Sequence, residues 1–134
     1  MTIRVVADTH ALHWYLQADP HLSVAAKAIL SATEAAGDQI AISTITLAEM
    51  VYLIDRGRLN AAILAQVAIL LDRQSATWVA IPVDRGVVSA MARIPRAEVP
   101  DLPDRLIAAT ALMLGVPVVS RDRKIRSSFV SSIW

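Results

Sequence analysis

Four acidic residues of this 134-residue chain lie after predicted strands or in predicted helices, in a sequence that alternates between strand and helix. Asp8 and Asp122 each follow a short apolar run, Glu49 lies within a predicted helix, and Asp104 opens another. The carboxyl ends of parallel strands share one edge of a sheet, and ligands of open α/β folds bind there. We therefore expect the four carboxylates to converge on one cleft.

A cluster of this kind has the chemistry of a hard-cation site. Carboxylate oxygens are preferred ligands of Mg²⁺ and Mn²⁺, and a bound cation relieves the repulsion between neighbouring carboxylates. Divalent ions held in this way activate water and stabilise the oxygens of a phosphodiester during its displacement. The acids therefore indicate metal-assisted phosphodiester hydrolysis. The chain contains no cysteine, which excludes thiolate catalysis and zinc–thiolate sites.

Each acid also has a structural explanation. Asp8 could cap the helix that follows it, and Asp122 could form an exposed ion pair with an adjacent arginine. Glu49 lies three residues after a threonine, which is the spacing of a capping box. Asp104 suits the positive end of a helix dipole, with Asp101 as the cap. Singly, Asp8 and Asp122 fit these structural roles better, whereas the four positions together favour a site.

The elements that position these acids follow from the apolar pattern. A buried helix is predicted over Pro103–Leu114, because proline suits its first turn, Gly115 suits its left-handed end, and apolar residues cover every side between them. The other predicted helices cover residues 9–17, 24–35, 45–56, 61–73, 85–93 and 123–127. The predicted strands cover residues 3–7, 40–42, 78–82, 116–120 and 130–134. This alternation predicts an α/β fold, with helices on both faces of a mostly parallel sheet.

Length and composition limit the other possibilities. The chain is long enough for one domain and too short for two, so residues 1–134 are expected to form a single domain. Its apolar content of 55% is high, and we expect a partner or second copy to cover part of the surface. No apolar run reaches the roughly 18 residues of a membrane span. The start of the chain also lacks a signal pattern. A cytoplasmic protein without membrane association is expected.

The remaining polar and aromatic signals are weak. A basic run at positions 121–126 is interpreted as a solvated loop, unless the neighbouring acids hold metal and turn it toward phosphate. His10 and His13 are predicted to be partly buried helix residues rather than metal ligands. The tryptophans are predicted to be packing residues rather than platforms for nucleic-acid bases, at positions 14, 78 and 134.

Three segments carry a more specific pattern, in order along the chain: VVADTHALHWYL, ISTITLAEMVYLIDRGRL and DLPDRLIAATALMLGVPVVSRDRKI. Together they resemble PIN-domain proteins, in particular VapC-like toxins of bacterial type II toxin–antitoxin pairs. The motif DTH alone is weak, whereas DRLIAATAL followed by a strand and SRD is fairly specific. The resemblance implies a PIN-like α/β/α sandwich with a mostly parallel sheet and a Mg²⁺- or Mn²⁺-dependent endoribonuclease that acts on RNA.

The resemblance also implies roles for the acids. Asp8, Glu49, Asp104 and Asp122 match the four acidic positions of the family. By that match Asp8, Asp104 and Asp122 hold the metal, while Glu49 ligates it or orients water.

Supporting roles and partners follow from the same resemblance. Thr9 and Ser120 match hydroxyl positions that hydrogen-bond within such sites, and Asp101 looks like a capping or supporting residue. The implied assemblies are a homodimer and a hetero-oligomer with a VapB-like antitoxin. We place the antitoxin groove between the predicted helices at 9–17, 45–56 and 60–73.

Other classes of function remain open. One is a PIN-like module that binds RNA or a partner without catalysis. Another is a phosphatase of the haloacid-dehalogenase type, which expects Asp-x-Asp after the first strand where this chain has Asp8-Thr9-His10. A receiver domain expects adjacent early acids and a late lysine, and neither is evident.

Overall fold

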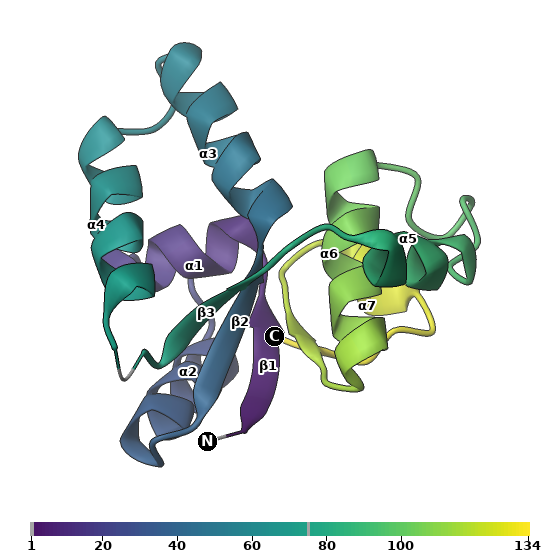
Figure 1. Cartoon of the computed structure of the whole chain (residues 1–134), viewed down its shortest axis with the longest axis horizontal. Coiled ribbons are helices and arrows are strands. Elements are labelled where there is room, and N and C mark those ends of the chain that lie inside the picture. The colour runs from purple at the N-terminus through teal and green to yellow at the C-terminus, as the bar shows by residue number, and fades with distance from the viewer. Residues whose placement is uncertain (1, 75) are drawn as a thin grey trace.

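One parallel sheet forms the centre of the molecule. The computed structural model describes residues 2–74 and 76–134 (Figure 1). Its strands are β1 (Ile3–Ala7), β2 (Gln39–Ser43), β3 (Trp78–Ile81), β4 (Val118–Val119) and β5 (Ser132–Ile133). They are ordered β3-β2-β1-β4-β5, and every neighbouring pair is parallel. The predicted α/β class and the parallel sheet are confirmed.

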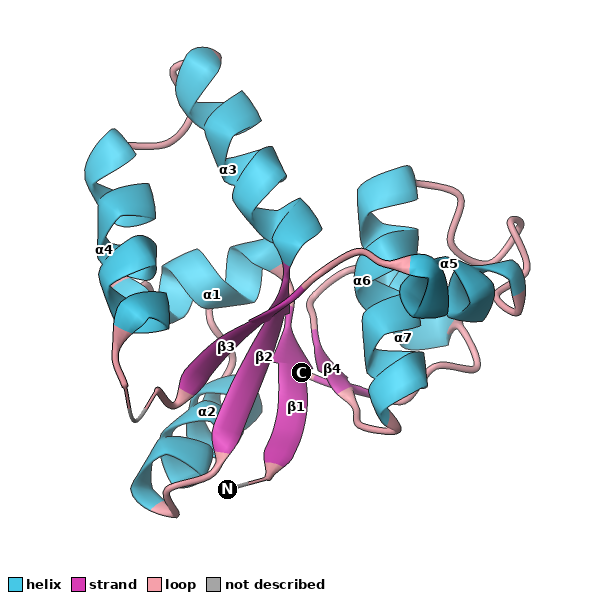
Figure 2. Cartoon of the chain, in the orientation of Figure 1, coloured by secondary structure: helices cyan, strands magenta, loops and turns pink. Residues whose placement is uncertain are grey.

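Helices cover both faces of this sheet. They are α1 (Thr9–Leu16), α2 (Val24–Ala35), α3 (Thr44–Asp55), α4 (Ala61–Asp72), α5 (Arg85–Ala92), α6 (Leu102–Leu114) and α7 (Arg123–Ser127). Helices α1 to α4 lie on one side of the strands and α5 to α7 on the other, which gives three layers (Figure 2). Within the described residues, no helix combines the length and apolar character needed to cross a membrane.

Alternation along β1 explains how the two apolar cores form. Val5 and Ala7 pack in the cluster that contains residues of α1, α2 and α4, whereas Val6 packs in the cluster of α5 and α6. Successive side chains of a strand point to opposite faces, so a short apolar strand can serve both layers. The strand therefore ends at Ala7 between the two layers of helices, and Asp8 follows it there.

Two strands are shorter than predicted. Val116, predicted as strand, instead donates its N–H to the carbonyl of Ala111 and closes the end of α6. Val130 donates to the hydroxyl of Ser128 in a turn, so the last strand pairs only through Ser132 and Ile133. In both places the backbone N–H forms its hydrogen bond within a turn, so it is not available for pairing between strands.

Helix α6 matches its predicted signals closely. Asp101 caps its N-terminus, proline stands in its first turn, and Gly115 ends it with a left-handed φ of 69°. All six residues from Leu106 to Ala111 are buried, although Met113 in the last turn is 39% exposed. The helix is therefore a rigid mount for Asp104 at its N-terminal end.

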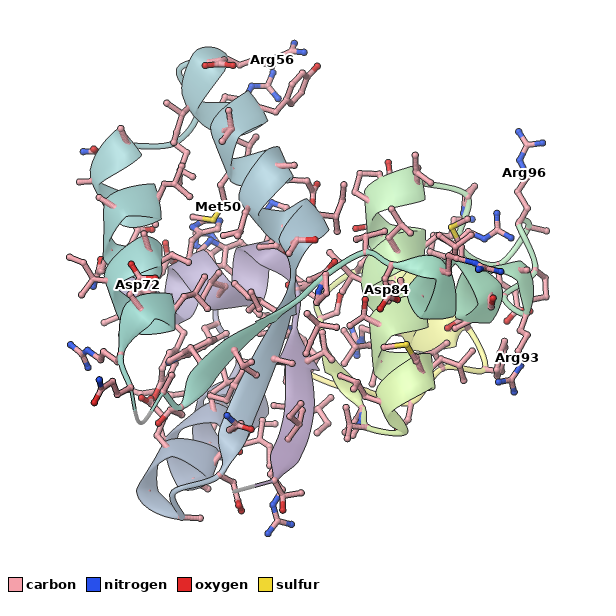
Figure 3. All side chains as sticks on the ribbon, in the orientation of Figure 1. Met50, Arg56, Asp72, Asp84, Arg93 and Arg96 are labelled. Carbon is pink, nitrogen blue, oxygen red and sulfur yellow. The ribbon has the colours of Figure 1, made fainter. Side chains whose placement is uncertain are left out.

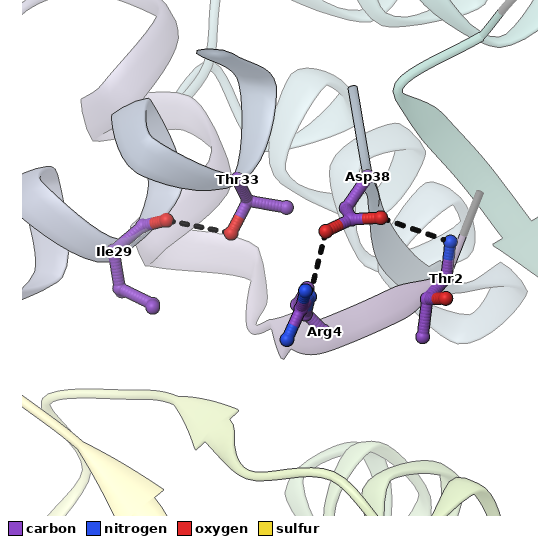
Figure 4. Close-up of polar contacts among 5 residues, drawn as sticks. All are labelled: Thr2, Arg4, Ile29, Thr33 and Asp38. Atoms are coloured by element: carbon purple, nitrogen blue, oxygen red, sulfur yellow. Dashed lines mark hydrogen bonds and ion pairs between the residues drawn. The ribbon is translucent and has the colours of Figure 1, made fainter. Parts of the chain in front are cut away.

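A polar contact fixes the opposite end of the sheet. Arg4 Nε donates to Asp38 Oδ2 over 2.7 Å, and the backbone N–H of Thr2 donates to Asp38 Oδ1 over 3.2 Å (Figure 4). These bonds join the start of β1 to the residue just before β2. Because this exposed ion pair is screened by water, its main contribution is to register rather than to stability.

Candidate active site

The candidate site lies where the strand order of the sheet reverses. β1 and β4 are neighbours, although β2 and β3 continue the sheet on one side of β1 and β5 on the other side of β4. Ligands of open α/β folds bind beyond the carboxyl ends of strands at such a point. Asp8 follows β1 here, and its backbone N–H donates to the carbonyl of Val119 at the end of β4.

A cleft of about 390 Å³ opens at this point. It is lined by Asp8, His10, Trp14, Asp104, Arg121 and Asp122. Three of the four predicted acids thus meet in one cavity, from three separate parts of the chain. The volume is within the range of roughly 300–1,000 Å³ that is usual for small-ligand sites.

Asp8 combines a structural role with a place in the cleft. Its side chain is 5% exposed, and its Oδ1 accepts a 2.8 Å hydrogen bond from the N–H of Ala11 as the cap of α1. Burial raises the pKa of this carboxyl, although hydrogen bonds from Ser120 and Ala11 act in the opposite direction. The predicted capping role is correct, and it leaves the carboxylate on the wall of the cleft.

Asp122 has the same double role at the start of α7. Its Oδ1 accepts from the N–H of Ile125 over 3.0 Å. Its own N–H donates over 3.0 Å to the hydroxyl oxygen of the fully buried Ser120. Among the described residues neither flanking arginine forms an ion pair with Asp122, so the ion-pair alternative is wrong. Ser120 therefore lies next to both acids, since its hydroxyl accepts from the backbone of Asp122 and lowers the pKa of Asp8.

Asp104 is the electrostatic centre of the site. Its pKa is raised to about 7, first by burial and then by the negative charges of Asp122, Asp101, Glu49 and Asp8, in that order. Its backbone N–H donates to Asp101 Oδ2 over 3.1 Å, which makes Asp101 the cap of α6, as predicted. Asp104 is therefore close enough to sense every other acid of the group.

Glu49 belongs to the site but does not line the cleft. The hydroxyl of the buried Thr9 donates to Glu49 Oε1 over 2.7 Å, and Thr46 Oγ1 lies 3.2 Å from the same hydroxyl oxygen. Burial raises the pKa of Glu49 while the bond from Thr9 lowers it. Because α3 begins at Thr44 with Ser43 as its cap, the capping-box explanation is wrong. Glu49 is tied to α1 instead.

The group fits a divalent cation by its chemistry. All the donors are carboxylate oxygens. Burial and then the neighbouring negative charges raise the pKa of Asp104, and a bound cation would neutralise those charges. In residues 2–74 and 76–134, no three His, Asp or Glu side chains already surround a point where an ion could sit. Mg²⁺ commonly binds through one or two carboxylates and keeps several waters, so a closed cage is not required.

The sequence interpretation missed one wall of the cleft. His10 is exposed rather than partly buried, and it lines the cleft together with Trp14 and Arg121. His10 and Trp14 are four residues apart and so share one face of α1, while Arg121 directly precedes Asp122. These spacings can be read from the sequence, but only the fold shows that the three side chains lie on the same cleft.

Comparison with known proteins settles the family. A family model described as PIN domain matches residues 5–127. This chain belongs to the PIN domain family. The predicted family is therefore confirmed. Within the family, Ribonuclease VapC22 of Mycobacterium tuberculosis is 30% identical over 123 residues, which cover 92% of this chain and 90% of that protein.

Solved structures share the PIN fold. VapBC2 of Rickettsia felis, bound to a DNA fragment from its promoter, matches with a TM-score of 0.70 at 18% identity, over 98% of this chain and 100% of that chain. A toxin-antitoxin complex from Klebsiella pneumoniae matches with a TM-score of 0.65 at 24% identity, over 97% and 96%. FitAcB of Neisseria gonorrhoeae matches with a TM-score of 0.63 at 22% identity, over 96% of this chain and 95% of that chain. The predicted α/β/α sandwich is confirmed.

Proposed function

We propose that this protein is a divalent-metal-dependent endoribonuclease that acts as the toxin of a type II toxin–antitoxin pair. The observation that carries the proposal is that Asp8, Asp104 and Asp122 line one cleft at the switch point of a PIN domain. The similarity to Ribonuclease VapC22 supports RNA as the substrate.

The proposed chemistry assigns a task to each residue. Asp8, Asp104 and Asp122 would hold Mg²⁺ or Mn²⁺. When bound, the ion supplies activation of water and stabilisation of charge on the phosphodiester oxygens. Glu49, held by the hydroxyl of Thr9, orients the attacking water or accepts its proton.

Two residues act by supporting the acids. Ser120 is fully buried, accepts a hydrogen bond from the backbone N–H of Asp122 and lowers the pKa of Asp8, so it supports both acids. Asp101 caps α6 and thereby positions Asp104 in the first turn of that helix.

The proposed antitoxin site is an apolar groove between α3 and α4. Its volume is about 380 Å³, and its lining is almost entirely apolar, with Leu47, Ala48, Val51, Leu64, Ala68, Leu71 and Asp72. The buried Met50 lies between the two helices (Figure 3). The groove was predicted to include α1, and none of its lining residues comes from that helix. Two of the structures with a similar fold are VapBC2 and a toxin-antitoxin complex, and both support a protein partner for this chain.

Three further expectations belong to the same proposal. Residues 1–134 form a single domain that acts in the cytoplasm, where its RNA substrate is available. A homodimer would cover some of the exposed apolar side chains, which include Val24 at 88% and Phe129 at 53% exposure.

Cleavage of RNA by the purified protein tests the proposal. The wild-type chain should cut single-stranded RNA with Mn²⁺ and stop when a chelator is added, and Asp104→Asn should cut at least about a hundredfold more slowly. Cleavage that survives both treatments would contradict the site. Binding of RNA without any cleavage would instead favour the non-catalytic PIN-like module.

A further inference from the structure

The cleft has an aromatic and basic wall beside its carboxylates. Trp14 projects from α1, and the guanidinium carbon of Arg121 lies 5.7 Å from the centre of the Trp14 ring. The ring of His10 lies 5.4 Å from the same ring. All three side chains line the cavity that contains Asp8 and Asp122.

The Trp14 ring is held in a fixed position. The ring of His21 stacks on it with centroids 5.4 Å apart and planes 25° apart, and the ring of Trp134 is tilted against it at 5.9 Å. Aromatic pairs at these separations stabilise one ring orientation. Trp14 is therefore a packing residue, as predicted, that also presents a preformed π surface to the cleft.

Arg121 has no acidic partner at this wall. In the described part of the chain, no carboxylate forms an ion pair with Arg121, although Asp122 is the next residue. The side chain is exposed, and exposed cation–π contacts are weak, so the guanidinium can leave the ring for a stronger partner at little cost. A phosphate is such a partner, because guanidinium binds it with two parallel hydrogen bonds.

We propose that Trp14 and Arg121 form a nucleotide-binding subsite next to the carboxylates. The base beside the cleaved phosphodiester stacks on the Trp14 ring, and Arg121 binds the next phosphate along the strand. This inference rests on the proposed ribonuclease function and names its substrate class as single-stranded RNA. A base offers its face to an aromatic ring only when it is unstacked, and such stacking tolerates any base.

Binding of RNA measures the subsite separately from cleavage. Every chain in the series carries Asp104→Asn, so the RNA stays intact, and the probe is a short fluorescent single-stranded RNA whose affinity is read by anisotropy. Adding Trp14→Ala should weaken binding about 5- to 150-fold, and Trp14→Phe should restore most of the loss. Adding Arg121→Ala should weaken binding and reduce the slope of log affinity against log salt by about 0.7, as for one phosphate contact.

The chain contains a matched control pair. Tyr52 of α3 and Arg56, the residue after its last turn, make the same kind of contact, with the guanidinium carbon 5.3 Å from the ring centre. Neither residue lines the cleft. Tyr52→Ala and Arg56→Ala should leave the affinity unchanged. A set of RNAs with one abasic site each should show a single position where loss of the base weakens binding to chains with Trp14 and has no effect with Trp14→Ala.

The outcomes separate the subsite from the proposed function. The subsite is overturned if RNA does not bind, if Trp14→Ala and Arg121→Ala bind as well as the control variants, or if no abasic position depends on Trp14. If Trp14→Ala in the chain with Asp104 cleaves RNA with an unchanged KM, the ribonuclease stands and the subsite fails. If the wild-type chain never cleaves, yet binding depends on Trp14 as described, the subsite stands and the ribonuclease fails.

Discussion

The hydroxyl of Thr9 donates a 2.7 Å hydrogen bond to Glu49 Oε1 and so joins the first turn of α1 to α3 at the rim of the acidic cleft. Thr9 is 4% exposed and directly follows Asp8, so one short segment positions two of the four acids. Hydrogen bonds to a carboxylate are about twice as strong as neutral ones, which makes this link a determinant of how Glu49 is oriented.

Loss of the Thr9 hydroxyl should impair cleavage without loss of the fold. Thr9→Val keeps the side-chain shape and removes the bond, and hydrogen bonds to charged groups contribute about 1.5–3 kcal/mol, so kcat should fall by about tenfold or more. The pKa of Glu49 should rise further, because the Thr9 bond lowers it. The loss should therefore be largest at low pH in a profile of kcat against pH. Thr9→Ser should behave as wild type, and equal rates for the two variants would contradict this role for the hydroxyl.

Stability without metal should depend on pH in an unusual direction. Asp104 has a pKa of about 7 in the folded chain and 3.8 as its ordinary value, so between these values the folded state binds a proton that the unfolded state releases. The free energy of unfolding should therefore fall as pH rises from about 4 to about 7, where most carboxylates act in the opposite sense. Thermal unfolding in a chelator should show that Asp104→Asn removes part of this loss and is more stable than wild type above that range. If the difference in stability between Asp104→Asn and wild type did not grow with pH, the proposed repulsion between carboxylates in the cleft would be contradicted.

A divalent ion should restore the stability that the chain loses when Asp104 ionises. Mn²⁺ at a hundredfold excess over its Kd adds about 2.7 kcal/mol, which corresponds to a rise in Tm of about 10 °C for a chain of this length. The rise should be smaller at about pH 6 than at about pH 8, because the ion competes with the proton on Asp104. Asp104→Asn should lose most of the rise. The same rise in wild type and variant would place the ion elsewhere.

Local signals in the sequence predicted most of the fold. β1 and α2 have the predicted bounds, since an apolar run that ends at Asp8 and a serine cap at Ser23 are complete local signals. β4 and β5 were predicted too long, because hydrogen bonds of neighbouring turns compete there for the same N–H groups. A strand end depends on pairing across the sheet, which a single sequence does not display.

The acids were predictable and the other wall of the cleft was not. Asp8 and Asp122 could be assigned to one sheet edge from topology alone, since both follow strands. Trp14 was correctly predicted to pack, but its position on the cleft depends on how α1 lies against the loop that carries Arg121. Likewise, the contact of Thr9 with Glu49 joins helices forty residues apart.

A charge in the groove between α3 and α4 should weaken antitoxin binding. Val51→Asp places a carboxylate in an almost wholly apolar lining, where an unpaired charge is costly, so affinity for the proposed antitoxin should fall at least about tenfold. Val88→Asp is the matched control, because Val88 is also 47% exposed and lies on α5. Affinities measured by calorimetry should differ between the two variants. Equal affinities would place the antitoxin elsewhere.

Two carboxylates of the cleft are helix caps, and the proposed ribonuclease requires them to perform chemistry as well. Asp8, Asp122 and Asp84 each cap a helix through a backbone N–H, and asparagine caps as well as aspartate. Asp84 caps α5 (Figure 3). It is not among the residues that line the cleft. All three Asp→Asn variants should therefore fold alike.

The decisive measurement is the single-turnover rate of RNA cleavage with Mn²⁺ for these three variants. We expect a wild-type rate for Asp84→Asn and a loss of at least about a hundredfold for Asp8→Asn and for Asp122→Asn. Rates that are alike for all three variants would contradict this expectation, since the acids of the cleft would then be helix caps alone.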